Sequence, residues 1–305
     1  MRAAAHANNK FLPADGAPSD MAATSVLIWL AIGLFLAGLL VEEHAHRFSA
    51  AGYVAFGSYW VTRLPYYVTE THSFVKTILI VAALPLSLYL AYLVYVREIG
   101  ELVTLGQAVA AMGLIYLPFA YWQPLNAALI EHTAHQEHRV LSLLGIDAEL
   151  VTKDGLERKF VVANPETGET YATYIILACT GLGSMSIFGG LIAAIEAPLH
   201  RKMKAFAVSI PVIYVLNLGR NVFITTAYGH QWFTFLGDTV EGFMGEYPGY
   251  ASFFWADKVI SQTLSVVALV GITLLVIKVM PEVMHLLDDL LSVLEGDHAS
   301  ADDAV

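Results

Sequence analysis

The chain has 305 residues, of which 57% are hydrophobic and only 14% are charged, with a mean hydropathy of +0.60. These values exclude an ordinary soluble domain, in which about a quarter of the residues are charged, and indicate a polytopic membrane protein. Acidic residues outnumber Lys and Arg by 27 to 16, and the formal net charge of -11 argues against a nucleic-acid partner and suits a surface in high salt.

The chain begins with a polar segment and continues with apolar windows. Residues 1–20 are rich in Ala, Pro, Gly and Asn and lack the apolar core of a signal peptide, so we interpret them as a disordered leader. A helix needs about 20 apolar residues to cross a bilayer. Six windows have roughly that length, namely 24–41, 74–96, 105–122, 171–197, 205–227 and 256–280.

A seventh window, 48–67, is apolar but carries Arg63 and Pro65. It could span the membrane, re-enter it or lie in the interface, and we favour a span, which would place the leader outside. The sequence therefore predicts an all-α membrane protein with six to eight transmembrane helices.

The segment between the windows 105–122 and 171–197 has a different composition. Residues 131–170 are charged and contain turn signals, so we interpret them as a loop outside the lipid. The runs AELVT and RKFVVA alternate in hydrophobicity on either side of Asp154-Gly155, a strong hairpin signal. We expect a small extracellular β-hairpin here.

The charges of the loops predict the orientation of the C-terminal half. The sequence PLHRKMK places Arg201, Lys202 and Lys204 in a turn between two windows, and short loops rich in Lys and Arg prefer the cytoplasm. Residues 228–255 contain neither Lys nor Arg and are therefore expected outside. Residues 281–305 then form a cytoplasmic amphipathic helix with an acidic tail.

Three chemically reactive residues lie at a similar depth in consecutive windows. Cys179, the only cysteine, lies about 12 Å below the outer start of its predicted span, at about 1.5 Å per residue. Arg220 lies at nearly the same depth in the next window, and Lys258 enters the last window from the outside. A lone cysteine in a membrane helix is usually a small apolar residue, and Lys258 could simply reach the headgroups or pair with Asp257. An arginine inside a span is costly, at about 2.5 to 3.5 kcal/mol, and normally faces an interior site.

Together these residues could perform acyl transfer. A guanidinium beside the thiol would lower the pKa of Cys179 and could stabilise the oxyanion formed on a peptide carbonyl. Lys258 could transfer protons to the leaving amine and from the incoming nucleophile, and His230, at the start of the outer loop, is the alternative residue for this role.

The motifs ACTGLGSM around Cys179 and NLGRNVF around Arg220, followed by a basic residue near the start of the next window, resemble the exosortase and archaeosortase family of membrane transpeptidases. The acidic chain looks most like the archaeal members from haloarchaea. The resemblance implies that residues 21–280 form a sorting enzyme with Cys179 as nucleophile, Arg220 as stabiliser of thiolate and oxyanion, and a third basic position. That position is Arg or His in the family and Lys258 here, which keeps the charge but loses the bidentate fork.

The resemblance also implies the substrates. Such enzymes recognise a C-terminal signal made of a short motif, a transmembrane helix and a basic cluster, and they cleave it outside the membrane. In the archaeosortases the motif is Pro-Gly-Phe, and the processed protein, typically an S-layer glycoprotein, is attached to a membrane lipid. No cofactor is implied.

Other interpretations remain open. A transporter with an Arg-lined path would use intramembrane charge, although broken helices or paired repeats are not evident. A serine protease would use Ser184 or Ser186 but has no evident histidine partner within the membrane. The cluster His132, His135 and His138 could bind zinc, but solvated side chains in an exposed loop are the simpler interpretation.

Overall fold

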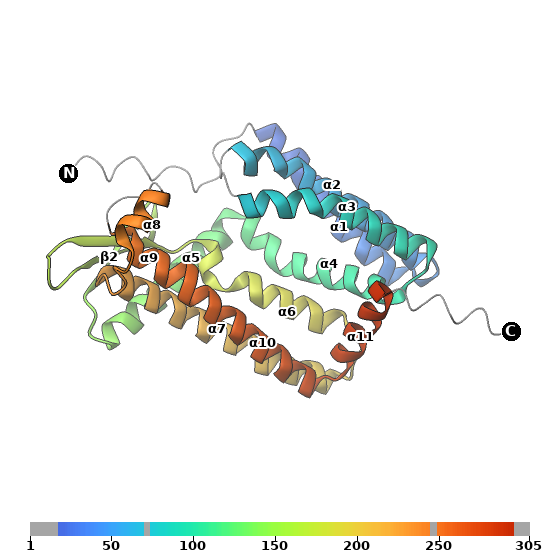
Figure 1. Ribbon diagram of the computed structural model, residues 1–305. Helices are drawn as coiled ribbons and strands as arrows, with labels where there is room; N and C mark the ends of the chain where they lie inside the picture. The colour runs from blue at the N-terminus through green and yellow to red at the C-terminus, as the bar shows by residue number, and fades with distance from the viewer. Residues whose placement is uncertain (1–17, 70–73, 245–248, 296–305) are drawn as a thin grey trace. The chain divides into compact units, whose positions relative to one another are not determined.

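The computed structural model describes residues 18–69, 74–244 and 249–295 and is mostly helical (Figure 1). Within these ranges, four helices are long and apolar enough to cross a membrane: Ile78–Val96, Gly100–Tyr121, Leu199–Gly229 and Tyr250–Val279. Ser25–Leu40 and Leu182–Ala194 are shorter apolar helices. The prediction of a helical membrane protein is thus confirmed. Four of the described helices meet the length and composition of a span, and the number of six to eight stays a prediction.

The chain divides into two compact units, residues 1–111 with 286–305, and residues 112–285. The first unit contains α1 (Pro18–Leu40), η1 (Glu42–His44), α2 (Ala45–Thr69), α3 (Phe74–Val96) and the first half of α4 (Gly100–Tyr121). Phe35 is completely buried there, and a Cβ on Gly52 or Gly106 would lie 2.8 or 2.5 Å from its ring. Glycine at these two positions lets α2 and α4 approach the ring closely.

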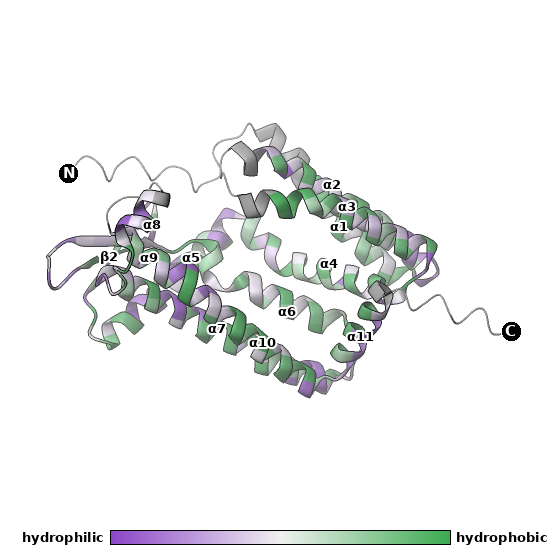
Figure 2. Cartoon of the chain, in the orientation of Figure 1, coloured by the Kyte–Doolittle hydropathy of each residue, from purple (hydrophilic) through white to green (hydrophobic). Residues whose placement is uncertain are grey.

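The second unit contains the remaining elements in chain order. Its helices and strands are α5 (Gln123–Leu143), β1 (Ala148–Lys153), β2 (Leu156–Ala163), β3 (Thr170–Tyr174), η2 (Leu177–Thr180), α6 (Leu182–Ala194), α7 (Leu199–Gly229), α8 (Gly237–Met244), α9 (Tyr250–Phe253), the π-helical η3 (Phe254–Ser261), α10 (Gln262–Val279) and the start of α11 (Glu282–Glu295). Figure 2 shows hydrophobic residues along α10 and hydrophilic residues on the hairpin of the sheet.

The strands form one antiparallel sheet in the order β1-β2-β3. Asp154 and Gly155 both have positive φ, at 53° and 80°, as a two-residue hairpin turn requires. The predicted hairpin is therefore present, extended by a third strand. Phe160 and Val162 of β2 are buried in a core with Ile130 and Leu141 of α5, so the sheet packs against a helix.

The predicted span 171–197 is not one helix. Its first residues belong to β3, where Thr170 pairs with Ala163 and Tyr174 with Lys159 of β2. A 3₁₀ turn follows, and α6 begins only at Leu182 and has 13 residues. Hydropathy could not distinguish this arrangement from a span, because strand, turn and short helix are all apolar here.

Three further expectations need correction. Residues 131–170 are not all loop, because α5 continues to Leu143, so the three histidines lie on a helix rather than in an exposed loop. The basic residues after Pro198 are not in a turn between helices but in the first turns of α7, which begins at Leu199. The last span begins not at residue 256 but at Tyr250.

Other expectations fall partly outside the described residues. The window 48–67 lies within the 25-residue helix α2, which is not one of the four candidate spans. The expected amphipathic helix after Met280 is α11. The leader falls largely on residues 1–17 and the acidic tail on residues 296–305, which are outside the described ranges.

Candidate active site

Cys179 lies in the 3₁₀ turn η2, directly before α6. The hydroxyl of Thr180 donates to the carbonyl of Leu177 at 2.8 Å and closes this turn. Gly181 follows in the left-handed conformation with φ +76°, and its Cβ position lies 3.1 Å from Cβ and Cγ of Asn217. The sequence analysis placed the thiol inside a membrane helix, whereas a left-handed glycine separates it from the helix that follows.

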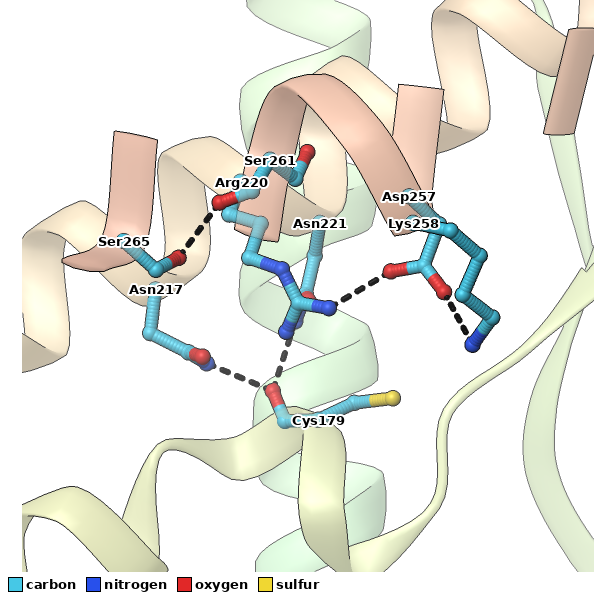
Figure 3. Close-up of polar contacts among 8 residues, drawn as sticks. All are labelled: Cys179, Asn217, Arg220, Asn221, Asp257, Lys258, Ser261 and Ser265. Carbon is cyan, nitrogen blue, oxygen red and sulfur yellow. Dashed lines mark hydrogen bonds and ion pairs between the residues drawn. The ribbon is translucent and has the colours of Figure 1, made fainter. Parts of the chain in front are cut away.

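Two amides of α7 hold the backbone of the cysteine. Asn217 Nδ2 donates to the carbonyl oxygen of Cys179 at 2.5 Å, and Asn221 Nδ2 donates to the same oxygen at 2.8 Å (Figure 3). Residues four apart lie on one face of a helix, so both amides point in the same direction. They satisfy both lone pairs of this carbonyl and fix the position of the thiol-bearing residue against α7.

Arg220 lies between these amides in the sequence and makes an ion pair with η3. Its Nη2 donates to Asp257 Oδ1 at 2.5 Å, and Lys258 Nζ lies 2.8 Å from Asp257 Oδ2 (Figure 3). The side chain of Asp257 is 11% exposed, that of Arg220 28% and that of Lys258 50%. One largely buried carboxylate therefore joins the two cations that the sequence analysis selected.

The π-helical backbone of η3 is part of this arrangement. Adjacent side chains of an α-helix point about 100° apart at 3.6 residues per turn. In η3, however, the ammonium of Lys258 contacts the carboxylate of the preceding residue, Asp257. A π-helical turn widens the helix locally and is frequent at functional sites. Among the described residues, this is the one π-helical segment.

Burial raises the pKa of the Cys179 thiol, which lies outside the helices that qualify as spans. A backbone hydrogen bond at Ile176 and the Arg220 guanidinium act in the opposite direction, while Asp257 and Glu137 add to the rise. Arg220 thus favours the thiolate, but the desolvation of the thiol outweighs the cation, so the pKa of Cys179 is raised overall.

Arg220 also borders a pocket between α6, α7 and α10. Asn217, Ser184 and Ser265 supply its other polar side chains, and Ile213, Leu216, Leu269 and Ile272 are apolar lining residues. Arg220 Nε is buried and has no hydrogen-bond partner among the described residues. The Nε–H is thus a donor that the ion pair with Asp257 does not use.

The remaining sequence candidates lie elsewhere. His230 caps the C-terminus of α7, ten residues beyond Arg220 and about 15 Å along the helix, where its ring stacks on Trp232. His135 pairs with Glu157 at 3.1 Å, and His132 lies 2.9 Å from Gln136. No cluster of three potential metal ligands occurs among the described residues.

Several residues of the site were not identified from the sequence. Asn217 and Asn221 flank Arg220 in the motif NLGRNVF, and their spacing of four could have identified an amide pair on one helix face. Asp257 was considered only as a partner of Lys258. The buried Glu137 of α5 had no distinctive local signal.

Comparison with known proteins identifies the family. Residues 19–257 match the family model described as Transmembrane exosortase. The chain belongs to the transmembrane exosortase family. The matched region of this exosortase contains Cys179, Arg220 and Asp257. The family supports a function as a membrane-embedded sorting transpeptidase.

Two relatives of this exosortase extend over nearly the whole chain. It is 36% identical over 290 residues to "Archaeosortase A" from Haloferax volcanii, which covers 90% of this chain and 95% of the relative. It is 37% identical over 295 residues to "Archaeosortase A" from Natronomonas pharaonis, covering 92% of this chain and 93% of the relative. The resemblance to archaeosortase A is thus confirmed. No solved structure matches the chain.

Proposed function

We propose that the chain is a membrane cysteine transpeptidase that cleaves a C-terminal sorting signal and transfers the processed protein to a membrane lipid. The observation that carries this proposal is the position of Cys179, whose carbonyl is held by the two amides that flank Arg220 in the chain. Because Cys179 is the only thiol of the chain, it is the one side chain able to form a thioester.

In the first step, the thiolate of Cys179 attacks the scissile carbonyl carbon of the substrate. The carbonyl becomes an oxyanion, and the donors of Arg220 stabilise its charge. The C–N bond then breaks, the C-terminal fragment leaves as an amine after accepting a proton, and the acyl group remains on sulfur. In the second step, a nucleophilic group of the lipid attacks the thioester and gives up its proton, the C–S bond breaks, and the departing sulfur takes that proton so that the thiol is restored.

Lys258 fills the third basic position of the proposed site. Its ammonium pairs with Asp257, and its side chain is half exposed, so it is available to an incoming peptide. Arg220 and Lys258 contribute two positive charges and Asp257 one negative charge, which leaves a net charge of one positive unit. This excess charge suits the anionic intermediates of acyl transfer.

The proposed substrates are surface proteins, such as an S-layer glycoprotein, with a C-terminal Pro-Gly-Phe motif, a transmembrane helix and a basic tail. This assignment rests on the resemblance to the archaeosortases. We further propose that the site lies near the extracellular face and that α11 and the tail are cytoplasmic, because Arg201, Lys202 and Lys204 gather at the opposite end of α7 from His230.

Trapping of a covalent intermediate tests the proposal. Membranes containing the protein are mixed with a substrate that bears the Pro-Gly-Phe signal, and the adduct is captured and located by mass spectrometry. We expect a thioester at Cys179 that hydroxylamine removes. The variant Cys179→Ala should form no adduct and no shortened product, while remaining folded, because the change removes little volume. Normal conversion by Cys179→Ala would exclude cysteine catalysis.

A further inference from the structure

Glu137 is a completely buried carboxyl group in α5, with an exposed fraction of 0%. Its Oε1 accepts a hydrogen bond from Thr225 Oγ1 of α7 at 2.7 Å, and Thr225 Oγ1 lies 3.0 Å from Thr173 Oγ1 of β3. Its second oxygen, Oε2, is buried as well and has no partner among the described residues. A buried carboxyl oxygen without a partner is costly and calls for an explanation.

The position of Glu137 relates it to the cysteine. Cys179 packs against a buried cluster that includes Ala134 and Leu141, which lie three residues before and four residues after Glu137. These spacings place all three side chains of α5 on one helix face. On α7, the donor to Glu137 is Thr225, one helical turn beyond Asn221, which holds the carbonyl of Cys179. Glu137 and Cys179 are therefore held by adjacent turns of one helix.

The surroundings of Glu137 contain few charges. From the sheet, β1 contributes Ala148 and β2 contributes Phe160 and Val162 to the same core. Arg158 lies on the same face of β2 but pairs with Asp154 at 2.6 Å in the hairpin. The elements packed against α5 are η2, α7, β1 and β2. Their titratable or charged residues include Cys179 on η2, Arg220 and Tyr214 on α7, Glu149 and Lys153 on β1, and Glu157, Arg158 and Lys159 on β2. Glu157 pairs with His135, and the Tyr214 hydroxyl donates to Gln136 Oε1, so neither is a partner of Glu137 Oε2.

The proposed reaction needs a proton acceptor that the basic residues do not provide. A guanidinium has no acceptor site, and an ammonium held in an ion pair, as at Lys258, has no free lone pair. His230 lies about 15 Å along α7 from Arg220. A carboxylate is a further class of acceptor. The two oxygens of Asp257 are engaged by Arg220 and Lys258. Glu137 also acts electrostatically on the thiol and has one oxygen without a partner among the described residues.

We propose that Glu137 accepts the thiol proton of Cys179, directly or through one water molecule, and delivers it to the leaving amine. This inference rests on the function proposed above. The S–H bond breaks and a carboxylic O–H bond forms, so the negative charge moves from the glutamate to the sulfur. When the C–N bond of the substrate breaks, the carboxylic acid gives its proton to the amine and becomes a carboxylate again.

The electrostatics agree with this exchange. Burial raises the pKa of Glu137 to about 7, against the opposing effect of the Thr225 hydrogen bond. A group with a pKa near neutral is present in both forms and is suited to accept and to donate a proton. The transfer also keeps the number of buried negative charges constant and moves the charge toward the guanidinium of Arg220, which avoids the cost of creating a new buried ion.

The test compares the wild-type protein with Glu137→Gln, both full length and in membranes. Because Cys179 is the only thiol, its alkylation by iodoacetamide between about pH 5 and pH 10 reports thiolate formation without interference. Conversion of the substrate with the Pro-Gly-Phe signal gives kcat and KM in parallel. The control is Glu149→Gln, which neutralises an exposed carboxylate on β1.

We expect Glu137→Gln to shift alkylation of Cys179 to lower pH, because a negative charge that opposes the thiolate is removed. We expect kcat to fall by about a hundredfold at unchanged KM, as is typical when a general base is lost. A purely structural role would not make the thiol more acidic while slowing turnover. Glu149→Gln should change neither quantity.

A second variant allows the inference to be tested even if Glu137→Gln does not fold. Thr225→Val removes the hydrogen bond to Glu137 and leaves its carboxyl group in place, and it should reduce kcat by a smaller factor than Glu137→Gln. An unchanged alkylation profile or an unchanged kcat for folded Glu137→Gln overturns the inference. Failure of the transpeptidase proposal is seen separately, since Cys179→Ala would then still convert the substrate.

Discussion

Arg220 and Asp257 lie 37 positions apart in the chain, and their side chains meet at 2.5 Å. The contact joins the long helix α7 to the π-helical segment η3 and leaves Arg220 Nε without a partner among the described residues. The ion pair orients the guanidinium before substrate arrives, and stabilisation of developing charge by such preorganised donors is usually the largest single term in catalysis.

Replacement of Asp257 by Asn should show how much this orientation matters. The amide keeps the volume but loses the charge that holds both Arg220 and Lys258, so we expect kcat to fall by about tenfold or more. Since Asp257 raises the pKa of Cys179, the thiol should also be alkylated at lower pH. Asp238→Asn, at an exposed position on α8, is the matched control and should behave as wild type. Normal turnover by Asp257→Asn would show that the ion pair is dispensable.

Arg220→Lys should reduce conversion by about two to three orders of magnitude, the loss seen when a donor to an oxyanion is removed. Lysine keeps a charge but has no planar fork, so it cannot bind Asp257 and retain a second donor in fixed geometry. Conversion of the full-length substrate is the measurement. Arg201→Lys, which alters the ion pair with Glu282 at 2.6 Å, serves as the control for an Arg to Lys change elsewhere on α7.

Lys258 and His230 compete for the role of third basic residue, and their variants should differ. Lys258→Arg should remain active, because the resemblance to the family implies Arg or His at this position, whereas Lys258→Ala should lose most conversion. His230→Ala should be close to wild type, since His230 stacks on Trp232 at the end of α7. Full activity of Lys258→Ala together with loss in His230→Ala would reverse the assignment.

Gly181→Ala should damage both stability and activity. The left-handed φ of +76° and a Cβ 3.1 Å from Asn217 disfavour a side chain, so we expect a loss of about 1 to 3 kcal/mol in the free energy of unfolding. Asn217 would also be displaced from the carbonyl of Cys179. Gly183→Ala is the control, because a Cβ there meets nothing within 4 Å and α6 tolerates alanine. Thermal unfolding and substrate conversion measure the two effects, and equal behaviour of both variants would contradict this explanation.

The proposed orientation can be tested with introduced cysteines in a Cys179→Ala background. A thiol at Met203, beside the basic residues that begin α7, should not react with a membrane-impermeant reagent in intact cells. A thiol at Thr167, exposed between β2 and β3, should react. Labelling at Met203 without labelling at Thr167 would invert the topology.

The sequence alone determined the features that depend on local chemistry. Long apolar runs form helices in a membrane because each satisfies its own backbone hydrogen bonds, so α3, α4, α7 and α10 are recognisable from composition. The hairpin at Asp154-Gly155 was equally readable, because few residue pairs adopt positive φ at two successive positions. The motifs around Cys179 and Arg220 also identified the family before any contact was known.

Tertiary structure decided how these residues meet. An apolar stretch fits a strand, a turn or a helix, and only pairing of Tyr174 with Lys159 assigned the start of the predicted span 171–197 to the sheet. The placement of Cys179 then followed from the left-handed Gly181 and from the amides of α7. Asp257 and Glu137 contact residues 37 and 88 positions away, and such pairs leave no periodic signal in the chain. Their roles depend on burial and on partners brought together by packing, which local composition does not encode.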